Sequence, residues 1–399
     1  MSNTVSLLKA VKYSDNRLSL KAVNLNNFIT TDNMLPNKKG VSIAINLPPK
    51  ESSVPAYSVN NILVGNIRPY LKKIWLASWG GGCSADVLVF EVGEGYDPKY
   101  IYYTMFRNDF FKHMMRGSKG TKMPRGDKNQ ILEFLIPDYS LPIQQKIALV
   151  LSTLDAKIEL NNRINEELEA MAKLLYDFWF VQFDFPNDNG KPYKTSGGKM
   201  VWNDELKREI PEGWEVGELS DIANITMGQS PPGESYNEKG NGTIFFQGCT
   251  DFGNRFPTIR QYTTQSSRFA KKGDILLSVR APVGLLNITN NDCCIGRGLA
   301  ALNSKDSCPA YLFGVMTNLK QIFDRRNVNG TTFGSITKDD LFSLKVIKPK
   351  KEILNLYHKT MHPTFEKQNT IELENQNLSE LRDWLLPMLM NGQLKIVGN

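Results

Sequence analysis

The sequence predicts an α+β fold in which two similar mixed α/β globules are each followed by a long helical region, and in which these regions pair with one another. The amphipathic run at residues 165–180 recurs at 375–390, an offset of 210. Its apolar residues step by three or four positions, as in a helix with one apolar stripe. The elements that precede each run also recur in the same order, which indicates a tandem duplication.

The first globule is predicted over residues 1–140 as a mixed domain. β-branched and aromatic residues indicate its strands, and a longer periodic segment indicates one helix. The loop after that helix is punctuated by glycine and carries five positive charges against one negative. The predicted order is strand, strand, helix, glycine-rich loop and a closing strand that Pro137 ends: residues 62–68, 86–92, 98–115, 116–128 and 131–136.

The second globule, residues 212–349, repeats this order. Gly120-Thr121 and Gly330-Thr331 lie 210 residues apart, within the two glycine loops. The segment ending at Arg280 corresponds in this prediction to the one ending at Arg68. The predicted strand, helix, loop and closing strand are residues 274–280, 310–326, 329–336 and 341–347.

The helical regions are predicted at residues 141–185 and 350–399, with a Gly-, Pro- and Asn-rich connector at 186–211. Because proline interrupts a helix, Pro363 predicts a joint in the second region, with an equivalent joint near Ser152 in the first. The longer pieces would span 154–180 and 364–386, and a helix of about 27 residues is about 40 Å long.

Each apolar stripe must be buried against a partner, and the stripe of the other helical region is the obvious one. The alternative is that both runs are ordinary core helices, which would be the better interpretation if the run occurred only once. Asn165 aligns with Asn375 and Asn161 with Ile371, and a buried Asn fixes the register of paired helices at some cost in stability. The predicted pairing residues are Leu154, Ile158, Leu168, Met171, Leu175, Phe178, Leu378, Leu381, Leu385 and Met388.

Composition limits the class of protein. The chain has 399 residues, more than one core usually organises, and a net charge of +7. Residues 1–140 carry 18 Lys and Arg against 11 Asp and Glu, and residues 212–349 carry 15 against 13, so the excess lies in the globules and suits a polyanion partner. Five cysteines without C-x-x-C spacing, and no signal peptide or apolar span, predict a cytoplasmic protein with reduced thiols.

Catalytic and metal-binding patterns are not found. His358 and His362 lie four apart, but Pro363 follows and no third ligand suggests itself, so surface histidines are the better interpretation. The glycine segments 80–82 and 228–233 match neither a P-loop nor a dinucleotide loop. We expect no catalytic residue, metal or cofactor on this chain.

The remaining signal is for binding. Lys and Arg neutralise phosphates, and Arg also reads guanine in the major groove, while glycine-rich loops let backbone N–H groups approach a phosphate. Taken singly, most of these residues suit a solvated surface. As a set at repeated positions, the DNA-binding candidates are Arg68, Arg116, Lys119, Thr121, Lys122, Arg125, Arg280, Arg297, Arg325, Arg326, Thr331 and Thr332.

The chain resembles the specificity (S) subunits of Type I restriction–modification enzymes over nearly its whole length. The motifs that carry the resemblance are Leu141–Ile147 (LPIQQKI), Leu174–Phe185 (LLYDFWFVQFDF), Gly190–Tyr193 (GKPY), Ile210–Val216 (IPEGWEV) and Leu381–Gly392 (LRDWLLPMLMNG). The chain departs from the family at residues 350–356, which match its Pro-x-x-x-Gln opening poorly, and the first copy lacks an equivalent of Pro211–Trp214.

The resemblance implies that residues 1–140 and 212–349 are target recognition domains, each of which reads one half of a bipartite double-stranded DNA site. The helices would run antiparallel about a pseudo-twofold axis, set the half-site spacing and dock two modification (methyltransferase) subunits. Restriction (endonuclease/translocase) subunits would complete the complex. S-adenosylmethionine, ATP and Mg²⁺ would bind to these partner subunits.

Two other readings remain. A self-sufficient DNA methyltransferase or nuclease would need cofactor motifs, and the purified chain alone would methylate or cut DNA. A coiled-coil scaffold that does not bind DNA would tolerate neutralisation of the loop cations.

Overall fold

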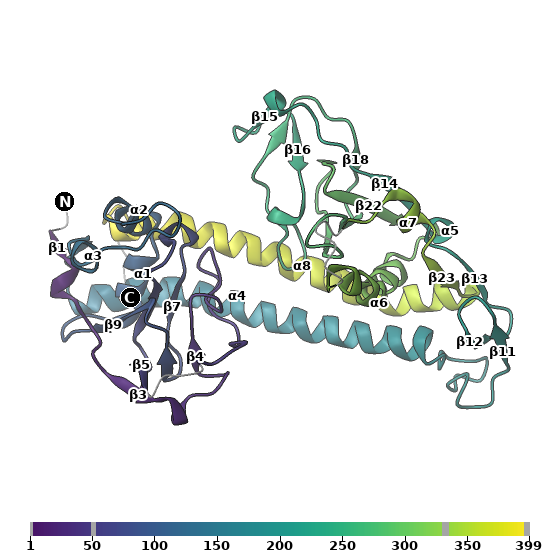
Figure 1. The fold of residues 1–399 in the computed structure, drawn as a ribbon, viewed down its shortest axis with the longest axis horizontal. Coiled ribbons are helices and arrows are strands. Elements are labelled where there is room, and N and C mark those ends of the chain that lie inside the picture. Colours follow the sequence, from purple (N-terminus) through teal and green to yellow (C-terminus); the bar gives the residue numbers. More distant parts are fainter. Residues whose placement is uncertain (1–2, 49–52, 329–334, 395–399) are drawn as a thin grey trace. The chain divides into compact units, whose positions relative to one another are not determined.

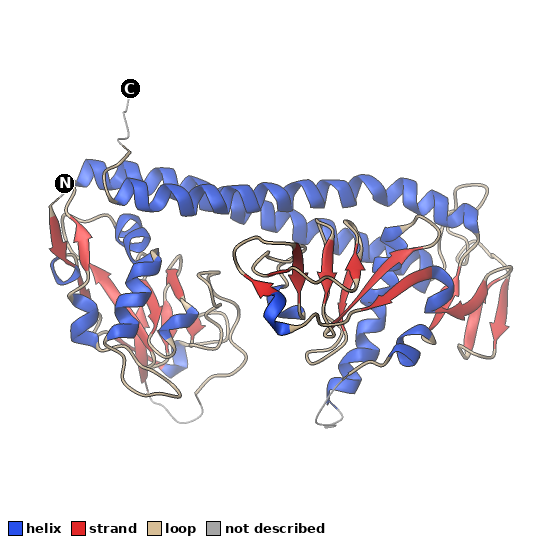
Figure 2. Cartoon of the chain, turned by 90° about the horizontal axis from the view of Figure 1, so that it is seen from above, coloured by secondary structure: helices blue, strands red, loops and turns tan. Residues whose placement is uncertain are grey.

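The structure is a computed structural model that describes residues 3–48, 53–328 and 335–394. It divides into two compact units, one formed by Met1–Leu160 with Gln376–Asn399 and the other by Asn161–Asn375. Each unit combines one β-rich domain with one stretch of two long helices (Figures 1 and 2). The domain boundaries expected at residues 140, 185, 211 and 349 stay a prediction.

The β-rich domain of the first unit contains two four-stranded sheets and one two-stranded pair. One sheet has the antiparallel order β2-β9-β6-β7, and the other has the order β3-β5-β8-β4 with β4 parallel to β8. β1 pairs with β10. The strands are β1 Thr4–Ser6, β2 Val11–Tyr13, β3 Arg17–Ser19, β4 Phe28–Ile29, β5 Ser53–Tyr57, β6 Ile62–Gly65, β7 Ile74–Leu76, β8 Gly81–Cys83, β9 Val87–Val92 and β10 Leu135–Pro137.

The domain of the second unit has the same core topology. Its antiparallel sheet β14-β22-β19-β20 corresponds to β2-β9-β6-β7, and the parallel pair β16·β21 corresponds to β4·β8. β13 pairs with β23, as β1 does with β10, and β11 and β12 form a hairpin. The strands are β11 Met200–Asn203, β12 Arg208–Pro211, β13 Glu215–Glu218, β14 Ala223–Met227, β15 Tyr236–Asn237, β16 Thr243–Phe246, β17 Tyr262–Thr263, β18 Phe269–Ala270, β19 Ile275–Ser278, β20 Leu286–Ile288, β21 Cys293–Ile295, β22 Leu299–Ser304 and β23 Lys345–Lys348.

The shorter helices follow the duplication with two local differences from the prediction. The helix expected at 98–115 is two helices, α1 Pro98–Phe106 and α2 Asn108–Arg116, because the chain turns to an extended conformation at Arg107. Each closing strand is preceded by a helical turn, since Asp127 and Thr337 cap the backbone N–H groups that follow them. The remaining short helices are α3 Lys128–Leu132, α5 Leu219–Ile222, α6 Pro309–Val328 and α7 Lys338–Phe342.

Two long helices complete the fold, and both are unbroken. α4 spans Leu141–Tyr176 (36 residues) and continues as a π-helical turn, and α8 spans Lys351–Met390 (40 residues). The expected joints near Ser152 and Pro363 are therefore wrong. Pro363 and Pro387 lie on the exposed side of α8, where the carbonyls left without a helical N–H donor can face water.

The helices pair in an antiparallel sense, as expected. In the first unit Asp155 contacts Arg382, and in the second Asn161 contacts Asn375 and Trp179 contacts Tyr357. The partner's number falls as the residue number rises, which defines the direction. Within each unit the core of the β-rich domain continues onto these helices, through Leu151 and Leu389 in one and through Trp179 and Tyr357 in the other.

Candidate nucleic-acid interface

A basic loop of the first domain folds against the end of strand β6. Lys119 and Arg125 exchange two backbone hydrogen bonds, at 2.9 and 3.0 Å, around a turn in which Gly120 has a φ of +94°. The Arg68 N–H donates to the Pro124 carbonyl at 2.8 Å, and Arg68 itself is left-handed at a φ of 52°. The fold therefore brings Arg68 together with the candidates at residues 116–125, which lie far from it in the sequence.

The side chains of this loop point largely into solvent. Arg125 lies 3.0 Å from Asp86 and Lys119 lies 3.4 Å from Asp127, and both are ion pairs with exposed cations, which contribute little to stability. Arg68, Arg116, Thr121 and Lys122 are exposed as well. An anion could therefore approach all six predicted residues without disrupting the domain.

Two candidates of the second domain, Arg280 and Arg297, lie at the same end of one sheet. β19 and β22 pair in a register that joins Ser278 to Leu299, and Val279 N–H continues it by donating to the Gly298 carbonyl at 2.9 Å. Beyond it the two segments diverge: Arg280 bridges to Ser335, and Arg297 lies in the turn before β22. Both arginines are exposed, so this end of the sheet carries two cations.

The residue of the first domain that is equivalent to Arg280 differs by one position from the predicted one. Ile67 bridges to Arg125 in the first domain, and Arg280 bridges to Ser335 in the second. Arg280 therefore corresponds to Ile67 and not to Arg68. Thr331, Thr332 and the side chains of Arg325 and Arg326 lie outside the described residues.

The predicted helix-pairing residues fall into two groups. Seven are half-buried: Leu154, Ile158, Leu168, Leu175, Leu378, Leu385 and Met388. Met171, Phe178 and Leu381 are instead exposed to 50%, 37% and 43%, so these three side chains are less covered than the other seven. They lie on a second apolar stripe, and the sequence repeat marks both stripes equally.

The seam itself is partly polar. Asn161 Nδ2 donates to Asn375 Oδ1 at 3.0 Å and to Glu374 Oε2 at 2.8 Å, and Asn375 Nδ2 donates to Asn162 Oδ1 at 2.9 Å. Asn161 and Asn375 are 1% and 6% exposed. The predicted asparagines therefore do enter the seam, and their mutual hydrogen bonds require one register.

The first domain is attached to the helices by a charged network. Asp155 on α4 accepts from the Tyr103 hydroxyl at 2.5 Å and from Arg382 Nη1 at 2.8 Å. The Arg382 guanidinium also stacks over the Phe106 ring, 4.8 Å from its centroid. The pKa of Tyr103 is raised because the hydroxyl is buried beside the Asp155 carboxylate.

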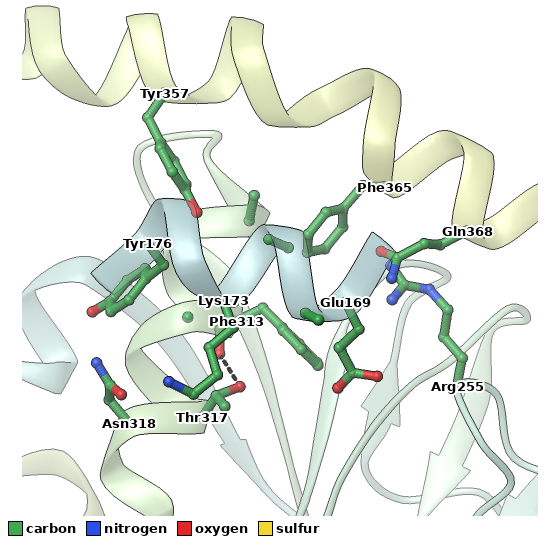
Figure 3. A pocket seen from close by; sticks show the side chains of 14 residues that line it. Glu169, Lys173, Tyr176, Arg255, Phe313, Thr317, Asn318, Tyr357, Phe365 and Gln368 are labelled. Carbon is green, nitrogen blue, oxygen red and sulfur yellow. Dashed lines mark hydrogen bonds between the residues drawn. The ribbon is translucent and has the colours of Figure 1, made fainter. Parts of the chain in front are cut away.

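The second domain is attached by aromatic contacts. The residues 210 positions from Tyr103, Asp155 and Arg382 are Phe313, Phe365 and Ala172, and the two rings meet edge to face at 5.9 Å. The small side chain of Ala172 leaves a pocket, which Figure 3 shows between α4, α6 and α8.

Arg255 enters this pocket from the β-rich domain of the second unit. Its guanidinium lies 4.8 Å from the Phe365 ring, and its Nε donates to Asn369 Oδ1 at 2.8 Å. Burial lowers the pKa of Arg255 to about 10, against the opposing pull of Glu169, Glu372 and Glu366. The pocket is thus part of the attachment between domain and helices.

The described part of the chain contains neither a metal site nor a membrane-spanning helix. No group of three His, Cys, Asp or Glu side chains within it could hold a metal ion. None of the helices in the described residues has the length and apolar character that crossing a membrane requires.

Ser230 and Gln247, which lie beside Arg297, are not among the residues predicted from the sequence. Ser230 belongs to the glycine segment 228–233, which matches no phosphate loop. Its Oγ accepts from Gln247 Nε2 at 2.8 Å and from the Arg297 N–H at 3.2 Å. The glycines on either side of Arg297 were the available signal, because they allow the backbone to pack closely.

Comparison with protein families gives one match that spans both units. The domain described as "Type I restriction modification DNA specificity domain" matches residues 78–170 and 211–382. A specificity subunit of the Type I restriction enzyme MjaIX from Methanocaldococcus jannaschii is 31% identical over 319 residues, which cover 76% of this chain and 70% of that protein. The HindI specificity subunit of Haemophilus influenzae is 26% identical and covers 74% and 77%.

Among solved structures, the S subunit of a Type I restriction–modification system from M. genitalium has a similar fold. The TM-score is 0.57 at 16% identity, and the alignment covers 100% of this chain and 97% of the other. This likeness concerns the arrangement of β-rich domains and long paired helices.

Proposed function

This chain belongs to the Type I restriction–modification DNA specificity family, and from that premise we propose that each of its β-rich domains reads one half of a bipartite DNA site. A specificity subunit is the non-catalytic member of a Type I complex and selects the DNA on which the complex acts.

One observation carries the proposal: both domains present exposed cations at the equivalent end of the same antiparallel sheet. In the first domain these are Arg68 and Arg125, and in the second Arg280 and Arg297. Exposed Arg and Lys side chains bind phosphates and, in the major groove, guanine edges. Two copies of one reading surface suit a site with two halves.

The paired helices are proposed to set the half-site spacing. α4 and α8 contain 36 and 40 residues, and a helix of that size is about 55–60 Å long. The buried asparagine contacts in the seam fix the register of one helix against the other. A fixed register is what a spacer of constant length requires.

The same helices are proposed to dock two modification subunits. Leu174 and Trp384 lie 210 residues apart and are exposed to 70% and 53%, and the exposed Met171 and Leu381 lie three residues before them. Exposed apolar groups at repeated positions suit two copies of one partner. The S-adenosylmethionine, ATP and Mg²⁺ of the reaction are assigned to the modification and restriction subunits.

The test is modified-base sequencing of DNA treated with modification subunits, S-adenosylmethionine and this chain. Methylation confined to a motif of two short sequences with a fixed spacer is the expected result. Methylation at one continuous motif would contradict the proposal. Methylation by the chain alone would support a self-sufficient enzyme. A methylated motif that is the same with and without this chain would support a scaffold that does not bind DNA.

A further inference from the structure

The amide of Gln247 is held in place at the basic end of the second domain. Gln247 follows strand β16, and its Nε2 donates to Ser230 Oγ at 2.8 Å. The Tyr236 hydroxyl, which donates to the Pro231 carbonyl at 2.9 Å, lies 3.3 Å from Gln247 Oε1. One side chain therefore faces each end of the amide and fixes its plane.

Gly296 and Gly298 pack against the backbone of Gln247 too closely to carry a side chain. A Cβ at position 296 would lie 2.9 Å from the Gln247 Cα, and one at position 298 would lie 2.8 Å from its carbonyl oxygen. In contrast, a Cβ on Gly248 would meet nothing within 4 Å. The amide is thus supported from behind, and the backbone beside it is open to a ligand.

At least half of the hydrogen-bonding capacity of this amide is unused by Ser230 and Tyr236. A glutamine amide has two N–H donors and two oxygen lone pairs. Ser230 Oγ takes one donor, and the Tyr236 hydroxyl, whose single proton goes either to Pro231 or to Gln247, takes at most one lone pair. This holds for either orientation of the amide, because a hydroxyl can donate or accept. One donor and one acceptor remain, which is the pair that adenine engages through N7 and N6 in the major groove.

The surroundings of the amide suit a nucleic-acid backbone. Arg297, whose N–H donates to the same Ser230 Oγ, is exposed, and the exposed Arg280 follows β19 at the same end of the sheet. Arg268 is exposed and its carbonyl accepts from Ile295 N–H at 2.9 Å. Three cations around one fixed amide can bind phosphates while the amide meets a base edge.

We propose that Gln247 reads an adenine in the half-site recognised by the second domain. The inference rests on the proposed function and adds to it the residue and the base. Ser230 acts as a positioning residue, because it holds the amide and does not itself meet the base.

The experiment measures base preference with the full modification complex. Wild-type and Gln247→Glu chains are assembled with modification subunits and given S-adenosylmethionine and a library of DNA fragments with randomised sequence. Sequencing of the methylated products then gives the preference at every position of both half-sites. Glutamate has no N–H donor for adenine N7, and its carboxylate accepts from cytosine N4.

The expected result is an adenine requirement at one position that Gln247→Glu weakens by about 10- to 100-fold, while the other half-site and the spacer keep their sequence and length. Ser230→Ala should reduce the preference at that position without creating a new one. Asn189→Asp, an amide-to-carboxylate change in an exposed turn of the connector, should leave the motif unchanged.

Three results would overturn the inference: no adenine in either half-site of the wild-type motif, an unchanged motif with Gln247→Glu, or an equal loss of methylation at all sequences. The last would mean that Gln247 only supports the loop. A wild-type complex without any bipartite motif would instead refute the proposed function, so the two failures are distinguishable.

Discussion

Asn161 donates a hydrogen bond to Asn375 in the seam between α4 and α8, and the duplication does not reproduce this contact. The positions 210 residues away are Ile371 and Asn165. Asn165 Oδ1 is buried and has no hydrogen-bond partner among the described residues. The two halves of the repeat therefore differ: Asn161 and Asn375 are hydrogen-bonded in the seam, and the buried Asn165 Oδ1 is not.

Removal of one partner of this contact should destabilise the helix pair. Asn161→Leu leaves the Asn375 amide buried with fewer partners, and we expect a loss of about 1–3 kcal/mol in the free energy of unfolding, measured by chemical denaturation. The double variant Asn161→Leu, Asn375→Leu should recover most of it. Asn165→Leu is the control and should not lose stability. Additive losses in the double variant would contradict this account.

The charged network at Asp155, which attaches the first domain to the helices, should be more sensitive to substitution than the aromatic contact at Phe365, which attaches the second. Asp155→Ala leaves Arg382 and the Tyr103 hydroxyl without their shared acceptor, and we expect a loss of about 2–3 kcal/mol in the free energy of unfolding of the first unit. Phe365→Leu at the corresponding position keeps an apolar side chain and should cost less. Equal effects of the two changes would show that the charged network has no special weight.

The basic loop of the first domain should contribute to DNA affinity through charge. Lys122→Ala with Arg125→Ala should weaken DNA binding and reduce the slope of log affinity against log salt by about one to two, as expected for two lost phosphate contacts. Subunit assembly should remain intact. Lys194→Ala with Lys207→Ala, in the connector, controls for net charge. Identical affinities at two salt concentrations would exclude Lys122 and Arg125 from the interface.

The exposed apolar repeat should control assembly. Leu174→Glu or Trp384→Glu places a charge in one of the two proposed docking sites, so each variant should bind one modification subunit where the wild type binds two. Native mass spectrometry of the assembled complex gives the count. Leu160→Glu is a matched control, because Leu160 is exposed to 46% but aligns with Thr370. Full assembly by both test variants would exclude this surface.

The long helices and the duplicated domain order could be predicted from the sequence, because both depend on periodicity and repetition. Which face of each helix is buried could not be predicted. Met171 and Leu175 both repeat as apolar residues, but the first is exposed and the second half-buried, and this difference depends on how α8 lies against α4. The helical turns at Lys128 and Lys338 depend on capping by Asp127 and Thr337, which apolar periodicity does not register.

The candidate site was predictable by residue type and not by proximity. Arg and Lys on glycine loops marked both basic ends. The placement of Arg280 and Arg297 at one end of the sheet depends on the pairing of β19 with β22, which apolar periodicity does not predict. Gln247 could not be identified from the sequence, because its neighbours Ser230 and Arg297 come from two other loops that only the fold brings together.

The most direct test of a duplicated reader with a helical spacer is a matched lengthening of both helices. Insertion of four residues after Leu160 in α4 and four after Asn375 in α8, at the boundary between the two compact units, adds about 6 Å to each helix between the segments that contact the two domains. Modified-base sequencing should then give the same two half-sites with a spacer longer by about two base pairs. Methylation at the original spacer length would contradict the account.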